Sequence, residues 1–381
     1  MGQPSNPTRS VWSRLCSDRR AIIGGAVLLA ILLLCTLTLP FTLGADASGP
    51  DAGVPRFNAG TSASARTPPA LSLFGLLGTD DLGRSLLYRC LAGGGISLTI
   101  GALATVVSVG IGTVYGAIAG YAGGRTDAVL MRVVDLLYGL PYVLLVVLLA
   151  VAADAMVDES VSRTRARAAL TLELARASDP TLAPLPDRAV HARIAADPTL
   201  AASLAKTALV QLPPRELSPA SRTAVDLATL LVAISGVSWL TTARVIRGQV
   251  LSLKAQPFVE AARAVGASNY RIFLRHLLPN LVAPIVVYAT LTVPQAILQE
   301  SFLSFLGIGV KPPLPSWGSL AARGVEELNP YRSDWWLLLF PCLLLGSTLL
   351  ALNFMGEALR DAIDPRSTQR GSEAPASANR A

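Results

Sequence analysis

Few residues in this chain have the types and spacings that catalysis requires. A nucleotide-binding loop of the Walker A kind has glycine directly before its lysine, whereas Lys206, Lys254 and Lys311 follow alanine, leucine and valine. His191 and His276 belong to no H-E-x-x-H pair, and the sequence contains no G-x-S-x-G. We therefore expect no catalytic residue, no cofactor and no metal bound by this chain, and a membrane-bound enzyme is a poor interpretation.

Two acidic residues lie within apolar segments, where an ionisable group is costly and marks a functional site by default. Asp135 lies near the start of its apolar run, so an ion pair with Arg132 or snorkelling to the surface explains it at least as well as function. Glu300 lies well inside its run. We expect it to be buried against a neighbouring helix rather than to relay protons.

A short amphipathic helix is predicted to start at Pro257, since the missing N–H of proline costs nothing in the first turn of a helix. Its apolar face repeats at i, i+3, i+4 and i+7 and comprises Phe258, Ala261, Ala262 and Val265. Glu260 and Arg263 lie on the other side, and Gly266 is expected to end the helix with a positive φ. By pattern alone, a helix lying on lipid fits as well as a helix that docks on a protein.

The elements that position these residues are predicted to be membrane helices. Only 15% of the 381 residues are charged and 52% are hydrophobic, whereas soluble domains carry about 25% charged residues. Six apolar runs are long enough to cross a bilayer: about 21–43, 96–121, 129–152, 224–242, 283–306 and 335–359. The sequence therefore predicts an all-α membrane protein with six transmembrane helices.

The positive charges predict the orientation of these helices. The net charge of +7 gathers at the ends of apolar runs rather than among aromatic residues, which argues against a nucleic-acid partner. Basic clusters occur at the N-terminus, after the second and fourth runs, and at the C-terminus. One topology makes all four cytoplasmic, and it divides the chain into a tail 1–20, a first helix 21–43, an extracytoplasmic connection 44–95, helices within 96–153, an insertion 154–222, helices within 223–360 with a cytoplasmic loop 244–282, and a tail 361–381.

Two of the connections have compositions of their own. The early part of the first connection, 45–69, is rich in Pro, Gly, Ser and Ala and is expected to be poorly ordered. The insertion 154–222 is rich in Ala, Arg, Asp and Pro, and contains Asp-Pro-Thr-Leu-Ala twice, at 179–183 and 197–201. We expect an extracytoplasmic segment with helical fragments, because long loops escape the positive-inside rule.

A stripe of small residues follows one face of the second run and recurs every fourth residue: Ala104, Ser108, Gly112, Gly116 and Gly120. Small side chains in register let another helix approach closely in a membrane. We expect this stripe to be a helix-packing surface.

Several motifs carry a resemblance to a known family. Glu260-Ala261-Ala262, followed by Gly266 and then Leu278-Pro279, resembles the EAA signature of ABC importer permeases. The run from 275 to 280, R-H-L-L-P-N, is similar to the ending found in the dipeptide/oligopeptide (DppC/OppC-like) subfamily. Gly-Thr-Asp at 78–80 with Gly-Arg at 83–84, and Pro-Ser-Trp-Gly at 315–318, also fit. The resemblance covers nearly the whole chain except the insertion and the extreme tails.

The resemblance implies a type I ABC importer permease in the bacterial cytoplasmic (inner) membrane, with both termini cytoplasmic. The implied partners are a second homologous permease subunit, two cytoplasmic ATPase subunits that hold ATP and Mg²⁺, an extracytoplasmic solute-binding protein, and lipid. The implied docking site comprises Phe258, Glu260, Ala261, Ala262, Gly266, Leu278 and Pro279. In it, Glu260 would bond to the ATPase, the two alanines would permit close packing, and Gly266 would permit the turn.

The implied solute is a dipeptide or oligopeptide. Nickel, glutathione-like thiols and antimicrobial peptides are carried by similar permeases and stay open as alternatives. Ser85 and Gly95 stand where the subfamily usually has aspartate and often has arginine, which bears on the solute more than on the mechanism. A secondary transporter is the alternative from another class, although no paired internal repeat supports it.

Overall fold

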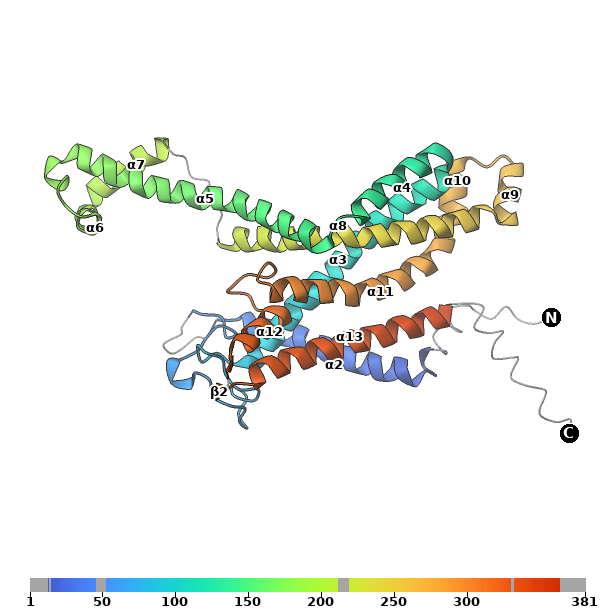
Figure 1. The fold of residues 1–381 in the computed structure, drawn as a ribbon, viewed down its shortest axis with the longest axis horizontal. Helices are drawn as coiled ribbons and strands as arrows, with labels where there is room; N and C mark the ends of the chain where they lie inside the picture. Colours follow the sequence, from blue (N-terminus) through green and yellow to red (C-terminus); the bar gives the residue numbers. More distant parts are fainter. Residues whose placement is uncertain (1–12, 14, 46–52, 212–218, 330–331, 364–381) are drawn as a thin grey trace. The chain divides into compact units, whose positions relative to one another are not determined.

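The computed structural model describes residues 13, 15–45, 53–211, 219–329 and 332–363, and these form a largely helical structure (Figure 1). In chain order the elements are α2 (Arg19–Leu43), η1 (Ser62–Ser64), α3 (Leu86–Ala122), α4 (Gly124–Tyr138), α5 (Tyr142–Ser178), η2 (Pro180–Leu182), α6 (Asp187–Ala196), α7 (Pro198–Gln211), α8 (Pro219–Lys254), α9 (Pro257–Ala264), α10 (Asn269–Ile272), η3 (Phe273–Leu277), α11 (Leu278–Phe305), α12 (Trp317–Glu326), β1 (Leu328–Asn329), β2 (Arg332–Ser333) and α13 (Trp336–Ile363). The chain divides into two compact units, Met1–Val146 with Leu230–Ala381, and Val147–Thr229.

Five helices in the described part of the chain are long and apolar enough to cross a membrane: Arg19–Leu43, Leu86–Ala122, Thr223–Lys254, Asn269–Phe305 and Trp336–Ile363. They correspond to the predicted first, second, fourth, fifth and sixth spans. The last helix continues to Ile363, so it includes the start of the predicted tail 361–381. Most of both predicted tails lies outside the described residues, and the side of the membrane that each connection faces stays a prediction.

The predicted third span, 129–152, is wrong as a single helix. α4 ends at Tyr138, and α5 begins again at Tyr142. Pro141 causes the break, because proline has no N–H to donate and disfavours the α conformation in the residue before it. α5 then runs on to Ser178, well past the predicted start of the insertion.

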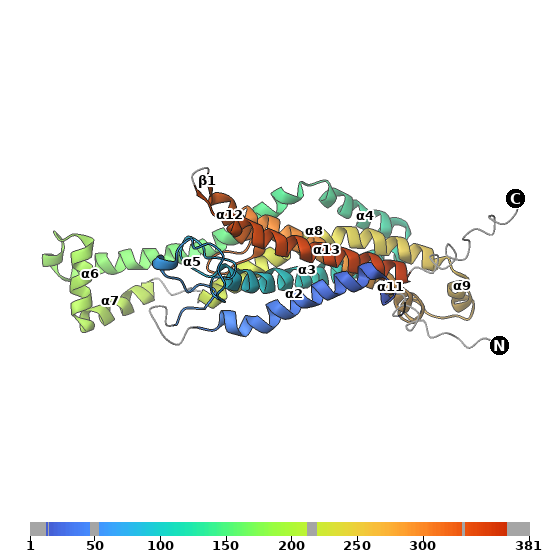
Figure 2. The same ribbon diagram turned by 90° about the horizontal axis from the view of Figure 1, so that it is seen from below.

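The core of the first unit lies where α2, α3, α11 and α12 meet. Its buried side chains are Ile31, Cys35, Leu98, Ile297 and Trp317. The indole Nε1 of Trp317 donates to the carbonyl oxygen of Cys90 at 3.0 Å. A Cβ at Gly94 would lie 2.5 Å from the Trp317 ring, so only glycine lets α3 pass this close. α2 and α13 lie side by side in this unit (Figure 2).

The small-residue stripe on α3 is buried along its whole length, and it lies against α8. It comprises Ala104, Ser108, Gly112, Gly116 and Gly120. A Cβ at Gly112 would lie 2.6 Å from Cβ of Thr242, and one at Gly116 would collide with the carbonyl oxygen of Ala243. The helix backbones therefore approach too closely for any larger side chain.

The expectation of poor order over 45–69 is wrong for residues 53–69; residues 46–52 lie outside the described part. Arg66 Nε donates to Glu327 Oε2 at 2.9 Å, and the Thr67 N–H donates to Thr79 Oγ1 at 2.8 Å. Asp80 accepts from Arg84 Nε at 2.7 Å and from the Arg84 backbone N–H at 2.9 Å. Composition could not reveal this order, because some partners lie far along the chain.

The second unit, Val147–Thr229, contains the predicted insertion and has its own core of Leu172, Ala175, Leu182, Val190 and Leu204. Both copies of Asp-Pro-Thr-Leu-Ala form the same capping turn. Asp179 accepts from Thr181 Oγ1 at 2.6 Å, and Asp197 accepts from Thr199 Oγ1 at 2.6 Å. These hydroxyls, together with backbone N–H groups, hold the pKa of each carboxyl below its ordinary value. The repeat therefore reflects two similar helix starts.

Candidate functional site

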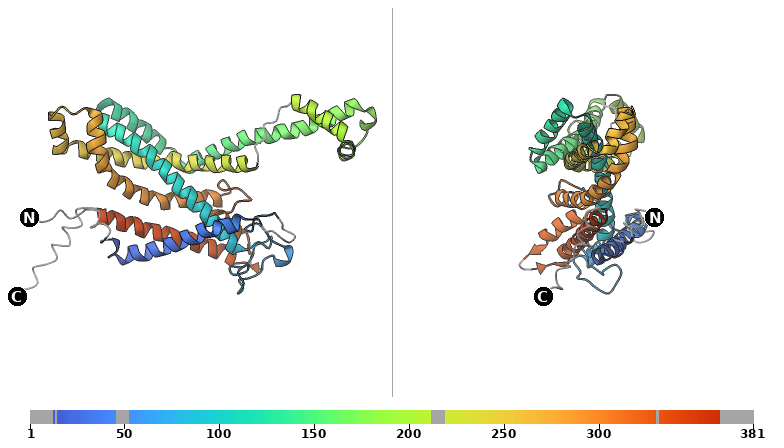
Figure 3. Two further views of the ribbon diagram at one scale, coloured as in Figure 1. Left: turned by 180° about the vertical axis from the view of Figure 1, so that it is seen from behind. Right: turned by 90° about the vertical axis from the view of Figure 1, so that its right-hand side faces the viewer.

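The loop between α8 and α11 folds as the short helices α9 and α10 and the π-helical turn η3 (Figure 3). α9 has Pro257 in its first turn, where a missing N–H is harmless. Gly266 has φ of +81°, the left-handed conformation that residues with a Cβ resist. Its N–H donates to the Arg263 carbonyl at 2.9 Å, and the Ala267 N–H donates to the Ala262 carbonyl at 3.0 Å. These bonds close the end of α9.

One side of α9 is anchored in the loop. Val259 is completely buried, in a cluster with Ile272 and Leu277, and Ala262 packs against the same cluster. Sequence reasoning missed Val259. The signal that could have found it is the spacing i, i+3 of Val259 and Ala262, which defines a second apolar face on the same short helix.

The opposite side of α9 is exposed. Phe258 is 39% exposed and Val265 is 89% exposed, and the side chains of Glu260 and Ala261 also face outward. The predicted single apolar face is therefore split, because Ala262 points into the loop. Phe258 and Val265 therefore leave apolar surface open on this side of α9.

Ion pairs and one lysine fasten the base of this loop to neighbouring helices. Asp135 pairs with Arg244 at 2.8 Å, so the suggested pairing with Arg132 is wrong. Arg247 donates two hydrogen bonds to Asp127, and these hold the pKa of the Asp127 carboxyl below its ordinary value. Lys254 Nζ donates to the Tyr121 carbonyl at 2.6 Å. The end of α8 is thus tied to α4 and to the end of α3.

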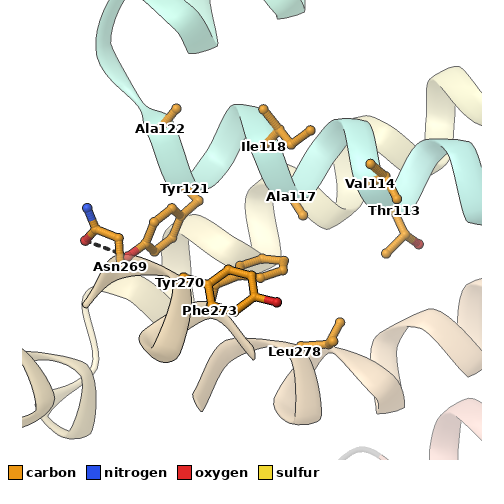
Figure 4. A pocket seen from close by; sticks show the side chains of 10 residues that line it. All are labelled: Thr113, Val114, Ala117, Ile118, Tyr121, Ala122, Asn269, Tyr270, Phe273 and Leu278. Carbon is orange, nitrogen blue, oxygen red and sulfur yellow. Dashed lines mark hydrogen bonds between the residues drawn. The ribbon is translucent and has the colours of Figure 1, made fainter. Parts of the chain in front are cut away.

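An apolar groove of about 460 Å³ lies beside the loop (Figure 4). It is lined by Thr113, Val114, Ala117, Ile118, Tyr121, Ala122, Asn269, Tyr270, Phe273 and Leu278. Tyr121 Oη donates to Asn269 Oδ1 at 2.9 Å, and the Tyr121 and Phe273 rings are 5.9 Å apart. None of the lining residues is acidic, basic or a histidine, and the polar side chains in the lining are those of Thr113, Tyr121, Asn269 and Tyr270. Leu278 belongs to this groove, and Pro279 follows in the first turn of α11.

Glu300 is fully buried, which confirms the expectation that it packs against neighbouring helices. Ser304 Oγ donates to its Oε1 at 2.7 Å, and Ser301 Oγ lies 3.2 Å from its Oε2. The side chains of Ser97 and Ser316 also hydrogen-bond to this carboxylate. Four hydroxyls therefore satisfy a group that would otherwise be costly to bury.

The described residues contain no group of three or more His, Cys, Asp or Glu that could hold a metal ion. Five helices of the described part that are long and apolar enough to cross a membrane, with a short helix in the loop between two of them, define a class, that of multi-pass membrane proteins. Within that class, the chain belongs to the family described as binding-protein-dependent transport system inner membrane component, whose profile matches residues 112–369.

Curated relatives share most of the chain. The dipeptide transport system permease protein DppC of Bacillus subtilis is 32% identical over 94% of this chain and 86% of its own length. The oligopeptide transport system permease protein OppC of the same species is 31% identical over 95% and 92%. OppC of Haemophilus influenzae is 35% identical over 78% and 72%.

Proposed function

We propose that this chain is a permease subunit of an ABC importer and forms part of the translocation path for dipeptides or oligopeptides. The observation that carries the proposal is α9. It sits in the loop where the EAA motif falls, its buried side fixes it to the loop, and its exposed side presents Phe258, Glu260 and Val265. The names of relatives that align over most of the chain support a peptide as the solute.

In this proposal α9 docks on a cytoplasmic ATPase subunit. Glu260 accepts a hydrogen bond from it, and Phe258 and Ala261 pack against it. Ala262 instead holds α9 to its own loop, because it contacts the cluster around Val259. Gly266 lets the chain turn back toward α10, and Leu278 and Pro279 start α11 beside the groove. Closure of the ATPases moves this anchored loop and shifts the helices between two packed arrangements.

The partners follow from this division of labour. A second homologous permease subunit completes the path, and the two form a heterodimer. Two ATPase subunits bind ATP and Mg²⁺, so this chain hydrolyses no ATP itself. A solute-binding protein delivers the peptide from outside, and lipid surrounds the apolar helices. Both termini and the loop 244–282 face the cytoplasm, and the connection 44–95 and the insertion 154–222 face outward.

A vesicle experiment tests the proposal. The chain is reconstituted with its second permease and its ATPases, loaded binding protein is added on the outside, and labelled peptide uptake is measured. We expect uptake that requires ATP inside and persists when an ionophore removes the proton gradient. Uptake that follows the proton gradient without ATP would instead establish a secondary transporter. Uptake of Ni²⁺ or a thiol in place of peptides would reassign the solute only.

A further inference from the structure

A second cavity, of about 300 Å³, lies at the C-terminal end of α11, whereas the loop between α8 and α11, called the coupling loop below, lies at its N-terminal end. α11 has 28 residues, so the two ends are about 42 Å apart at 1.5 Å per residue. The cavity is lined by residues of α3, of the end of α11, of the segment that follows α11, and of α12. Three of them are basic, Arg89, Lys311 and Arg323, and one is acidic, Glu326.

Arg89 is buried, and its ion pair with Asp80 is long and shared with another arginine. Its side chain is 3% exposed, and among the described residues its Nε and Nη1 atoms have no hydrogen-bond partner. The nearest carboxylate is that of Asp80, whose Oδ2 lies 3.7 Å from Nε. That carboxylate is already bonded to Arg84, with Oδ2 2.7 Å from both Nε and Nη2 of Arg84. Two buried arginines thus share Asp80, and Arg84 also lies 3.8 Å from Asp81 Oδ1.

Buried charges in proteins are paired, because an unpaired charge away from water is very costly. A guanidinium presents a planar fork of donors that fits the two oxygens of a carboxylate. Lys311 and Arg323 line the same cavity, so with Glu326 the lining carries three positive charges and one negative charge. The cavity is therefore suited to a carboxylate.

The other residues that line the cavity favour the end of a peptide over a simple inorganic anion as its ligand. Phe305, Leu306, Val310, Pro312 and Leu314 give the cavity an apolar wall. Its volume is at the lower end of the range for small-molecule sites, which is about 300–1,000 Å³. One terminal residue, with its side chain on the apolar wall and its carboxylate on the basic side chains, fits such a space better than a whole oligopeptide.

We propose that this cavity binds the C-terminal carboxylate of the peptide in transit, an inference that rests on the peptide-import function proposed above. Arg89 and Arg323 hold the carboxylate, and the apolar wall holds the last side chain. The cavity lies remote from the coupling loop, at the end of the helices where a peptide released from outside would arrive.

The test compares trialanine with trialanine amide in the complete reconstituted importer, with one binding protein throughout. In wild type we expect the free acid to be taken up with the lower KM. Arg323→Gln is expected to raise KM for the acid by about tenfold and to leave the KM of the amide unchanged. Lys311→Gln should act in the same direction. Arg19→Gln neutralises an exposed arginine on α2 and is the matched control.

Each other result has a distinct meaning. If wild type takes up both peptides equally well, or if the variants leave the ratio of the two KM values unchanged, the carboxylate site is wrong and peptide import stands. If Arg323→Gln weakens uptake of both peptides equally and also weakens retention of loaded binding protein, the cavity is a docking contact for that protein instead. If wild type takes up neither peptide, the import function fails and this proposal fails with it. Arg89→Gln should act in the same direction as Arg323→Gln; should it prevent assembly because Asp80 loses a neighbour, Arg323→Gln and Lys311→Gln decide.

Discussion

Gly266 is required because its backbone has a positive φ, and not because a side chain would lack room there. Its φ is +81°, and a Cβ placed there would meet nothing within 4 Å. Gly266→Val should therefore strain the turn by roughly 1–3 kcal/mol through conformation alone. That is comparable to the few kcal/mol that separate two conformations of a transporter. We expect the variant to insert and to co-purify with its partners, while loaded binding protein no longer stimulates ATP hydrolysis.

Gly266→Asn is the control for this change, because asparagine tolerates positive φ better than other residues with a Cβ. It should keep most of the stimulation. Normal coupling in Gly266→Val would mean that α9 transmits nothing, and that it is a surface helix only.

Glu260 is exposed on α9, so its removal should not disturb the fold. Glu260→Ala would delete a charged hydrogen bond to the ATPase, worth about 1.5–3 kcal/mol. We expect normal amounts of the subunit in the membrane, weaker retention of the ATPases during purification, and little peptide uptake. Glu173→Ala, at an exposed glutamate in the second unit, should behave as wild type. Equal retention in both variants would remove Glu260 from the interface.

For single residues, the sequence predicted backbone roles better than it predicted which neighbours a side chain contacts. Gly266 and Pro257 were predictable because backbone chemistry restricts those positions to a few residues. Val259 was missed because a helix of two turns has room for two apolar faces, and only the tertiary contacts with Ile272 and Leu277 select one. The pairing of Asp135 with Arg244 was missed for a similar reason, because it joins α4 to α8.

The contact between α3 and α8 depends on the small volume of the glycine residues on α3. A Cβ at Gly116 would collide with the backbone of Ala243, whereas one at Gly110 on the same helix would meet nothing within 4 Å. Gly116→Ala should cost about 1–3 kcal/mol through overpacking and lower the Tm of the purified subunit in lipid nanodiscs. Gly110→Ala should leave the Tm unchanged or slightly raised. Equal Tm values in the two variants would show that the helices can separate freely.

The second unit is expected to be dispensable for assembly, because its core of Leu172, Ala175, Leu182, Val190 and Leu204 is its own. Deleting residues 160–218 and joining the ends with a short flexible linker should leave co-purification with the ATPases intact. Loss of that co-purification would make the insertion a structural part of the permease. Assembly without transport would point to a role in receiving the binding protein.

The positions where a helix breaks were the features that the pattern of apolar residues predicted least well. Pro294 and Pro341 stay inside α11 and α13, whereas Pro141 separates α4 from α5. The hydropathy of the three segments looks alike, so it does not show which proline breaks a helix. A membrane helix tolerates proline when neighbouring groups compensate for the lost hydrogen bond. Near Pro141 the chain also has Gly139, which lowers the cost of leaving the helix.

The topology of the whole molecule can be tested at two exposed positions. In a background without native cysteines, a cysteine at Ala196 should react with an impermeant maleimide added outside, and one at Ser268 should react only after the membrane is opened. The distribution of arginines is the basis for both expectations. Reaction of both positions from the same side would overturn the orientation proposed here.

The class of the molecule was predictable from sequence because a bilayer imposes long apolar helices, and such runs survive in composition alone. The order of residues 53–69 was not, because it depends on contacts such as that between Arg66 and Glu327, 261 residues apart. The basic cavity was not predictable either. Arg89, Lys311 and Arg323 are unremarkable in sequence, and only the fold brings them together.

The two ion pairs between α4 and α8 differ in a way that makes the base of the loop responsive to ionic strength. The side chains of Asp135 and Arg244 are 59% and 40% exposed, while those of Asp127 and Arg247 are 14% and 34% exposed. The Debye length falls from about 10 Å at 0.1 M salt to about 3 Å at 1 M, and exposed charges are screened most. As the salt concentration around this loop rises, the pair of Asp135 and Arg244 weakens first and the pair of Asp127 and Arg247 persists longer. α4 then stays attached to α8 through Asp127 and Arg247, while the contact of Asp135 with Arg244 becomes the looser of the two.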